Sequence, residues 1–242
     1  MNNIEIKNYK ELIRNSIEHF WDTRNAQKSN QLETNIRDTG NRSAVTGGKQ
    51  LDGFLVLLKK VAMDIGIPEE HIHLKGNNLP GFFRPTKDWD ILIISPTKKL
   101  ISVVELKSQV GSFGNNFNNR TEEAIGSAVD LWTAYRENAF ANQSAPWVGY
   151  LMLVERSKKS TSPVRISDPH FKVFSEFNNT SYLDRYRILC KKLMLERHYS
   201  NCCLTWTESD KSFGHLDKET SMEQFLYAFA GHLISHLHEF NN

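Results

Sequence analysis

Two runs of apolar, largely β-branched residues lie on either side of a short turn between Trp89 and Ser108. They read WDILIIS and LISVVELKS, and the PTKK between them is typical of a turn. A connection this short predicts an antiparallel β-hairpin. The runs carry charge at two places, Asp90 at the start of the first and Glu105 with Lys107 near the end of the second. Because apolar strands tolerate charge poorly, these three residues require an explanation.

The expected hairpin brings the charged residues together. Fourteen residues separate Asp90 from Glu105, so a turn centred near Thr97 and Lys98 places the two acids opposite each other. Glu105 and Lys107 are two apart and project from the same face of their strand. Two carboxylates and an ammonium on one face suit a phosphodiesterase that uses a hard cation such as Mg²⁺. Acids at strand ends are also often merely solvated, and Glu105 with Lys107 matches a surface ion pair equally well.

The remaining pattern predicts an α/β fold with a mixed central β-sheet flanked by helices. No break in composition and no repeat divides the chain, so we expect a single domain over residues 1–242. The continuous apolar run PWVGYLMLVE is typical of a strand that is covered on both faces. We expect helices at Tyr9–Gln27, Gly48–Ile65, Thr121–Asn138, Ser181–His198 and Ser221–Phe240, further strands at Pro146–Glu155 and Asn201–Thr207, and a polar loop at Lys28–Gly47.

Composition excludes several classes of protein. No apolar run approaches the ~18–20 residues of a membrane span, and the polar N-terminus does not resemble a signal peptide. Cys190, Cys202 and Cys203 lack the spacing of a zinc site or of a disulfide framework, which favours the cytoplasm. The net charge of +2 neither requires nor excludes binding to nucleic acid.

The pattern Asp-x(14)-Glu-x-Lys formed by Asp90, Glu105 and Lys107 resembles the core of the PD-(D/E)xK nucleases, with Trp89 where that pattern usually has Pro. Longer segments resemble the XhoI-type restriction endonucleases: LPGFFRPTKDWDILI, ELKSQVGSFGNNFNNRTEEAIGSAVDLWTAYRE, PHFKVFSEF and SYLDRYRILCKKL. The resemblance implies a Mg²⁺-dependent homodimer that cuts double-stranded DNA at the palindrome CTCGAG. It also implies a companion DNA methyltransferase that protects the host DNA.

The same resemblance implies roles for individual residues. Asp90 and Glu105 correspond to metal ligands and Lys107 to the catalytic lysine, and the carbonyl of Leu106 completes the metal shell. Some members of the superfamily use an extra acid from an upstream helix. Glu69 or Glu70 is the candidate here, although acids that follow a proline also suit the start of a helix.

The segment GSFGNNFNNR, which we expect to be a loop after the second strand, is the main candidate for reading DNA. Asn side chains suit adenine and Arg suits guanine, while Gly111 and Gly114 would let the backbone approach a groove. Asn and Gly are also ordinary turn residues, and Asn119 with Glu122 matches a capping box. The candidates for contact with DNA are Gln109, Asn115, Asn116, Asn118, Asn119 and Arg120, with Lys87 and Arg84 either on the phosphates or simply solvated.

Two other functions explain the same residues. One is a PD-(D/E)xK nuclease of different or relaxed specificity, which a panel of DNA sites would distinguish. The other is a non-catalytic DNA-binding module whose acids are only structural. Such a protein would bind DNA but would not cut it in the presence of Mg²⁺ or Mn²⁺.

Overall fold

The computed structural model describes residues 9–34 and 49–240. Its α-helices are α1 (Lys10–Thr34), α3 (Asp52–Ile65), α4 (Phe113–Arg136), α5 (Lys158–Thr161), α6 (Tyr182–Leu195) and α7 (Met222–Ser235). Its strands are β1 (Ile72–His73), β2 (Asn78–Pro80), β3 (Thr86–Asp88), β4 (Ile91–Ile94), β5 (Leu100–Gln109), β6 (Trp147–Glu155), β7 (Asn201–Thr207) and β8 (Phe213–His215). Short 3₁₀ turns are η2 (Glu69–His71), η3 (Ser175–Phe177) and η4 (Leu237–Glu239).

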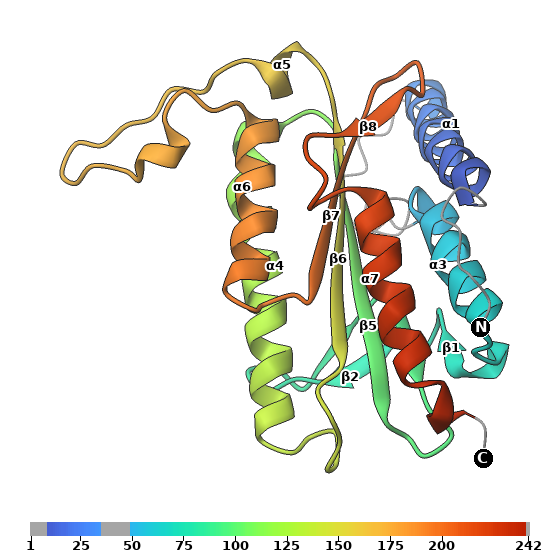
Figure 1. The fold of residues 1–242 in the computed structure, drawn as a ribbon. Helices are drawn as coiled ribbons and strands as arrows, with labels where there is room; N and C mark the ends of the chain where they lie inside the picture. The colour runs from blue at the N-terminus through green and yellow to red at the C-terminus, as the bar shows by residue number, and fades with distance from the viewer. Residues whose placement is uncertain (1–8, 35–48, 241–242) are drawn as a thin grey trace.

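A mixed six-stranded sheet in the order β1-β4-β5-β6-β7-β8 forms the middle of three layers. Helices α4 and α6 cover one face of this sheet, and α1, α3 and α7 cover the other (Figure 1). Each face therefore has its own cluster of buried apolar side chains. The α/β class with a mixed central sheet, expected from the sequence, is confirmed. Among the described residues, no helix is long and apolar enough to cross a membrane.

The central strand β6 explains why PWVGYLMLVE is apolar throughout. It pairs in parallel with β5 on one side and with β7 on the other, and every residue except Glu155 is buried. A strand in this position has helices over both faces, so neither face can carry polar side chains to solvent. The prediction of a doubly covered strand is confirmed, and β5 lies beside this buried central strand.

Several expected boundaries are wrong. Helix α1 continues to Thr34, so the first part of the loop expected at Lys28–Gly47 is helical, and residues 35–48 lie outside the described part of the chain. The final helix ends at Ser235, because a separate 3₁₀ turn, η4, follows it. Helix α6 begins where expected, since the Ser181 hydroxyl accepts the N–H of Asp184 in a capping box.

The largest correction concerns GSFGNNFNNR, which is not a loop but the start of α4. The chain turns sharply at Gly111 and Ser112, both with positive φ, and the helix begins at Phe113. Asn119 and Glu122 therefore lie inside the helix, and the capping box proposed for them is wrong. Gly114 serves close packing against α6, because an added Cβ would lie 3.0 Å from the Tyr182 hydroxyl oxygen.

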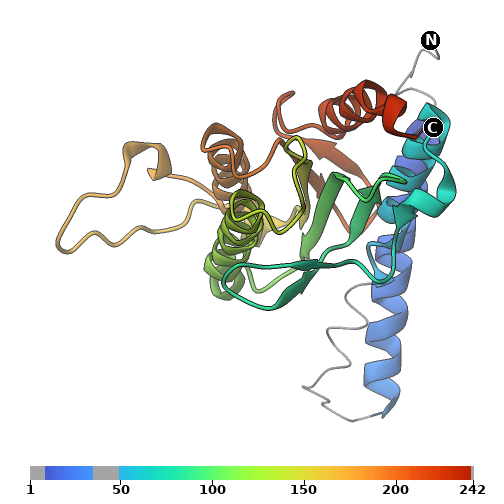
Figure 2. The same cartoon turned by 90° about the horizontal axis from the view of Figure 1, so that it is seen from below.

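A two-stranded ribbon, β2–β3, lies apart from the main sheet and leads directly into the site. Asn78 pairs with Asp88 at its open end, and the Trp89 N–H donates to the Asn77 carbonyl. From that end the ribbon reaches under α4, as Figure 2 shows in teal. Neither short strand was anticipated from the sequence. The ribbon fixes the backbone immediately before Asp90.

Candidate active site

The hairpin register places the two acids opposite each other, as the spacing predicted. Strands β4 and β5 are antiparallel with Ile91 opposite Val104, so the preceding residue, Asp90, faces Glu105. The Asp90 N–H donates to the Val104 carbonyl at 3.2 Å, and its carboxylate Oδ2 accepts the Leu106 N–H at 2.6 Å. These two hydrogen bonds extend the hairpin one residue beyond β4 and fix the position of the carboxylate.

Alternation along the strands puts the charged residues on one face of the sheet. Val104 and Leu106 belong to the cluster under α1, α3 and α7. Side chains between them in sequence point the opposite way, so Glu105 and Lys107 face the side covered by α4 and α6. Asp90 precedes Ile91, which also belongs to the first cluster, and therefore points to the same side as Glu105.

Burial and like charge disfavour the ionised form of Asp90. Burial raises the pKa of its carboxyl group to about 6, and the charge of Glu105 adds to the effect. The Leu106 hydrogen bond and the charges of Lys107 and Lys87 act in the opposite direction but only partly compensate. Asp90 therefore ionises less readily than a carboxyl group in water, and a further positive charge nearby would favour its ionised form.

Lys107 is a charged ammonium that contacts Glu105. Its Nζ lies 2.5 Å from Glu105 Oε1, and the Glu105 side chain is only 5% exposed. Burial by itself lowers the pKa of Lys107, but the nearby Glu105 carboxylate, with Asp90 and Glu123, outweighs burial and raises it. Lys107 is therefore protonated and carries a positive charge at neutral pH.

The residues present fit a hard divalent cation. The carboxylates of Asp90 and Glu105 lie opposite each other, Glu105 is buried, and the N–H of Leu106 points to Asp90. Because the N–H and C=O of one residue in an antiparallel pair point to the same side, the Leu106 carbonyl also faces the Asp90 side. Residues 9–34 and 49–240 contain no group of three or more His, Cys, Asp or Glu that could hold a metal ion. Two acids and one main-chain carbonyl match the coordination preference of Mg²⁺, which binds few protein oxygens and keeps several water ligands.

Lys87 and Arg84, the candidates for phosphate contact or for solvated charge, each contact a buried carboxylate in this structure. Lys87 Nζ lies 2.7 Å from Glu105 Oε2, on the oxygen that Lys107 leaves free. Arg84 Nε lies 2.6 Å from Oδ2 of Asp130, a buried residue of α4. Asp130 was missed by the sequence reasoning, because nothing in its spacing links it to the ribbon 46 residues earlier.

The extra acid expected at Glu69 or Glu70 lies away from the site. Strand β1 pairs antiparallel with β4, with Ile72 opposite Ile93 and His73 opposite Leu92. Residues that precede Ile72 are therefore at the turn end of β4, whereas Asp90 is at the other end. Glu69 forms an ion pair with Lys59 at 2.5 Å, so it supports α3 rather than a metal.

The candidates for reading DNA divide into two groups on α4 and at its start. Gln109 is buried and donates to the Gly111 carbonyl, Asn116 donates to the Ser112 carbonyl, and Arg120 pairs with Glu123 at 2.6 Å. These three side chains hold the β5–α4 junction together. The exposed members are Asn115, Asn118 and Asn119. They present their amides from successive turns of one helix rather than from a loop.

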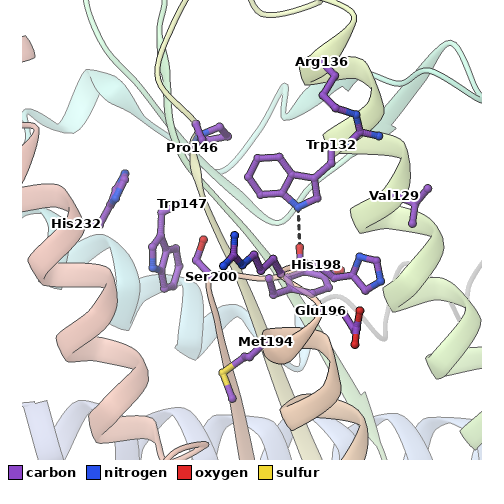
Figure 3. Close-up of a pocket in the computed structure, with 13 residues that line it drawn as sticks. Val129, Trp132, Arg136, Pro146, Trp147, Met194, Glu196, His198, Ser200 and His232 are labelled. Atoms are coloured by element: carbon purple, nitrogen blue, oxygen red, sulfur yellow. Dashed lines mark hydrogen bonds between the residues drawn. The ribbon is translucent and has the colours of Figure 1, made fainter.

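A hollow of about 720 Å³ lies at the end of the sheet where β6 begins, between α4, α6 and α7 (Figure 3). Pro146, Trp147 and Trp132 are among its walls, and the Trp132 indole N–H donates to the His198 carbonyl at 2.9 Å. Glu105 and Lys107 pair with residues further along β6, Tyr150 and Met152. Asp90, Glu105 and Lys107 do not line this hollow. The hollow is therefore separate from the candidate active site.

Comparison with known proteins gives one consistent result. The family model described as restriction endonuclease XhoI matches residues 30–217. The type II restriction enzyme BstVI of Geobacillus stearothermophilus is 47% identical over 83% of this chain and 92% of its own length. The type II restriction enzyme XhoI of Xanthomonas vasicola is 47% identical over 80% of this chain and 78% of its own. AbrI of Azospirillum brasilense, also a type II restriction enzyme, is 45% identical over 70% of this chain and 77% of its own length. No solved structure matches the chain.

Proposed function

The chain belongs to the XhoI family of type II restriction endonucleases, and we propose that it hydrolyses double-stranded DNA at CTCGAG with Asp90, Glu105 and Lys107. As a restriction enzyme it binds DNA, and its family typically requires a divalent metal. The observation that carries the assignment of residues is the meeting of Asp90 and Glu105 across the hairpin, with Lys107 on the same face. The target sequence rests on the family resemblance alone.

We assign Asp90, Glu105 and the Leu106 carbonyl to a Mg²⁺ ion. When bound, Mg²⁺ supplies positive charge that stabilises the phosphate and the attacking water during hydrolysis. The hydrogen bond from the Leu106 N–H orients the Asp90 carboxylate, and the hairpin holds Glu105 opposite it. Because these contacts exist before metal arrives, the backbone that carries the two acids is already in place for binding.

Lys107 has a separate role in this proposal. Hydrolysis forms a bond from a water oxygen to phosphorus and breaks the bond from phosphorus to a deoxyribose oxygen, while negative charge grows on the phosphate oxygens. The Lys107 ammonium lies beside Glu105, with a side chain 27% exposed, and remains charged at neutral pH. It offsets that growing charge and orients the attacking water by hydrogen bonding.

The exposed amides of Asn115, Asn118 and Asn119 are the base-reading groups in this proposal. An α-helix fits the major groove of DNA, and a carboxamide can both donate to and accept from adenine. We also propose that one domain, spanning the chain, acts in the cytoplasm as a homodimer. A two-fold dimer presents the same helix to both halves of a palindrome. A separate methyltransferase of matching specificity protects the host DNA.

Digestion of a plasmid with one CTCGAG site tests the proposal. A matched plasmid in which that site is changed to CTGCAG serves as control, and each is incubated with Mg²⁺ or with EDTA. We expect one linear product from the first plasmid only, dependent on metal. The substitution Lys107→Ala should slow cutting at least about a hundredfold, while DNA binding measured by gel shift in Ca²⁺ persists.

Each alternative has its own outcome in that experiment. Metal-dependent cuts that map to other sequences would retain the active site and reject CTCGAG. Binding without cutting by the wild-type protein, in either Mg²⁺ or Mn²⁺, would reject the assignment of Asp90, Glu105 and Lys107 to catalysis. A monomer by light scattering in the presence of a DNA duplex containing CTCGAG would reject the dimer.

A further inference from the structure

Glu105 has an ammonium group on each of its two carboxylate oxygens. Lys107 Nζ lies 2.5 Å from Oε1 and Lys87 Nζ lies 2.7 Å from Oε2. The Lys87 side chain is 12% exposed and that of Glu105 is 5% exposed, so solvent screens this second pair little. One lysine is sufficient to pair one carboxylate. The second lysine is therefore the feature that the family pattern of one acid pair and one lysine leaves unexplained.

Lys87 is held in this position by three further features. It lies on β3, which pairs with β2 through Lys87 opposite Leu79. Its ammonium also donates to the Asp88 carbonyl at 2.9 Å and lies 4.3 Å from the centroid of the Trp89 ring. Trp89 is itself buried. The ribbon thus presents Lys87 to Glu105 in a fixed orientation, rather than leaving a flexible side chain at the surface.

The charges in the site show what Lys87 changes. Asp90 and Glu105, when ionised, carry two negative charges, and Lys107 offsets one of them. Lys87 offsets the other, so the four side chains together are neutral. A divalent cation that binds to Glu105 must therefore displace Lys87 from Oε2 or accept its repulsion at close range.

We propose that Lys87 is a positioning residue that occupies Glu105 in the metal-free enzyme and competes with the divalent cation for that carboxylate. The inference rests on the proposed function, in which Asp90 and Glu105 hold the metal. Lys87 keeps two facing carboxylates from repelling each other before metal arrives. Lys87 also sets the metal concentration at which the enzyme becomes active, because the cation must compete with the Lys87 ammonium for the Glu105 carboxylate.

Metal affinity, measured apart from cleavage, tests this inference. Mn²⁺, which accepts the same oxygen ligands as Mg²⁺, is titrated into the full chain without DNA, and free Mn²⁺ is followed by electron paramagnetic resonance. Lys87→Met keeps an unbranched aliphatic side chain at this position and removes the charge. We expect roughly tenfold tighter Mn²⁺ binding by this variant. Lys87→Arg keeps the charge and should bind Mn²⁺ within about twofold of the wild type.

Two controls separate this inference from a structural role and from the proposed function. Lys218→Gln removes one positive charge from an exposed lysine in the β8–α7 loop and should leave the affinity unchanged. Asp90→Asn should abolish the tight Mn²⁺ site. Lys87→Gln provides a second uncharged variant if the methionine variant does not fold, as judged by circular dichroism.

The outcomes are distinguishable. If Asp90→Asn abolishes binding while Lys87→Met and Lys87→Gln bind Mn²⁺ no more tightly than the wild type, the inference about Lys87 is overturned and the metal site stands. If Asp90→Asn leaves Mn²⁺ binding intact, the metal lies elsewhere and both proposals are overturned. A tighter Mn²⁺ site in the uncharged variants and an unchanged site in Lys87→Arg would establish the competition.

Discussion

The structure contains two carboxylate sites that are linked by one β-ribbon and differ in their hydrogen-bond and ion-pair partners. At the tip of the ribbon, Asp130 accepts the N–H groups of Phe82 and Phe83, both at 2.8 Å, and the guanidinium of Arg84 at 2.6 Å. At the base of the ribbon, Asp90 and Glu105 face each other, with ammonium groups on Glu105. Arg84 and Lys87, three residues apart, supply a cation to each site.

The difference between these sites fits a structural role for Asp130 and the proposed metal-binding role for Asp90. Burial alone would raise the pKa of Asp130, but the fixed N–H donors and Arg84 outweigh it, so the pKa is lowered. The pKa of Asp90 is instead raised to about 6, because burial and Glu105 prevail over a single N–H donor and two lysines. A carboxylate satisfied by fixed N–H donors is suited to stabilising the fold, whereas two facing carboxylates, one of them with a raised pKa, are suited to binding a cation.

Loss of cleavage in Asp90→Asn is the largest effect that we expect. The substitution removes one metal ligand but keeps an oxygen that can accept the Leu106 N–H. The initial rate of plasmid cleavage at saturating DNA should fall about a thousandfold. Asp130→Asn is the matched control, and a comparable loss in that properly folded variant would mean that the two sites do not differ in function.

Loss of stability in Asp130→Ala should come second. The change leaves two backbone N–H groups and the Arg84 guanidinium without their shared acceptor. We expect the free energy of unfolding in urea to fall by about 2–3 kcal/mol. Arg84→Met should cost only about 1 kcal/mol, since Arg84 is 43% exposed and both N–H donors keep Asp130. If Asp130→Ala and Arg84→Met lowered the free energy of unfolding equally, the backbone N–H donors would not be the main partners of Asp130.

A small gain of stability in metal-free Asp90→Asn should complete the comparison. A carboxyl whose folded pKa is raised binds protons more readily folded than unfolded, so stability is lost as pH rises from its unfolded pKa, near 4, through about 6. At pH 8 the variant should exceed the wild type by about 1 kcal/mol, because that penalty is gone. The advantage should vanish below pH 4, where Asp90 is protonated in both states. Urea unfolding in EDTA at both pH values measures it, and a constant difference would refute the cause given.

The largest error in the sequence analysis, the loop predicted at the start of α4, has a physical cause. The Gly/Asn-rich start of α4 has low helix propensity, and the prediction of a loop followed from that. Phe113 stacks on Tyr182 with ring centroids 5.9 Å apart, and Phe117 meets Tyr186 edge-on at 5.1 Å. Both tyrosines come from α6, more than sixty residues later. Tertiary packing therefore overrode local preference, and no window of neighbouring residues contains that information.

The sequence by itself determined the features that depend on neighbours along the chain. A short turn fixed the hairpin register, which placed Asp90 opposite Glu105, and strand alternation placed Lys107 beside Glu105. A continuous apolar run identified β6 as doubly covered. These features follow from strand geometry and from the free energy of burying apolar groups, and both can be inferred from residues that are close in sequence.

Only the tertiary structure decided which charges meet across the fold. It paired Lys87 with Glu105 and Arg84 with Asp130, and it set Glu69 at the end of β4 opposite to Asp90. Ion pairs between distant residues depend on where a separate ribbon and a helix come to rest. That placement is the sum of many packing contacts, so the electrostatics of the site emerge only once the chain has folded.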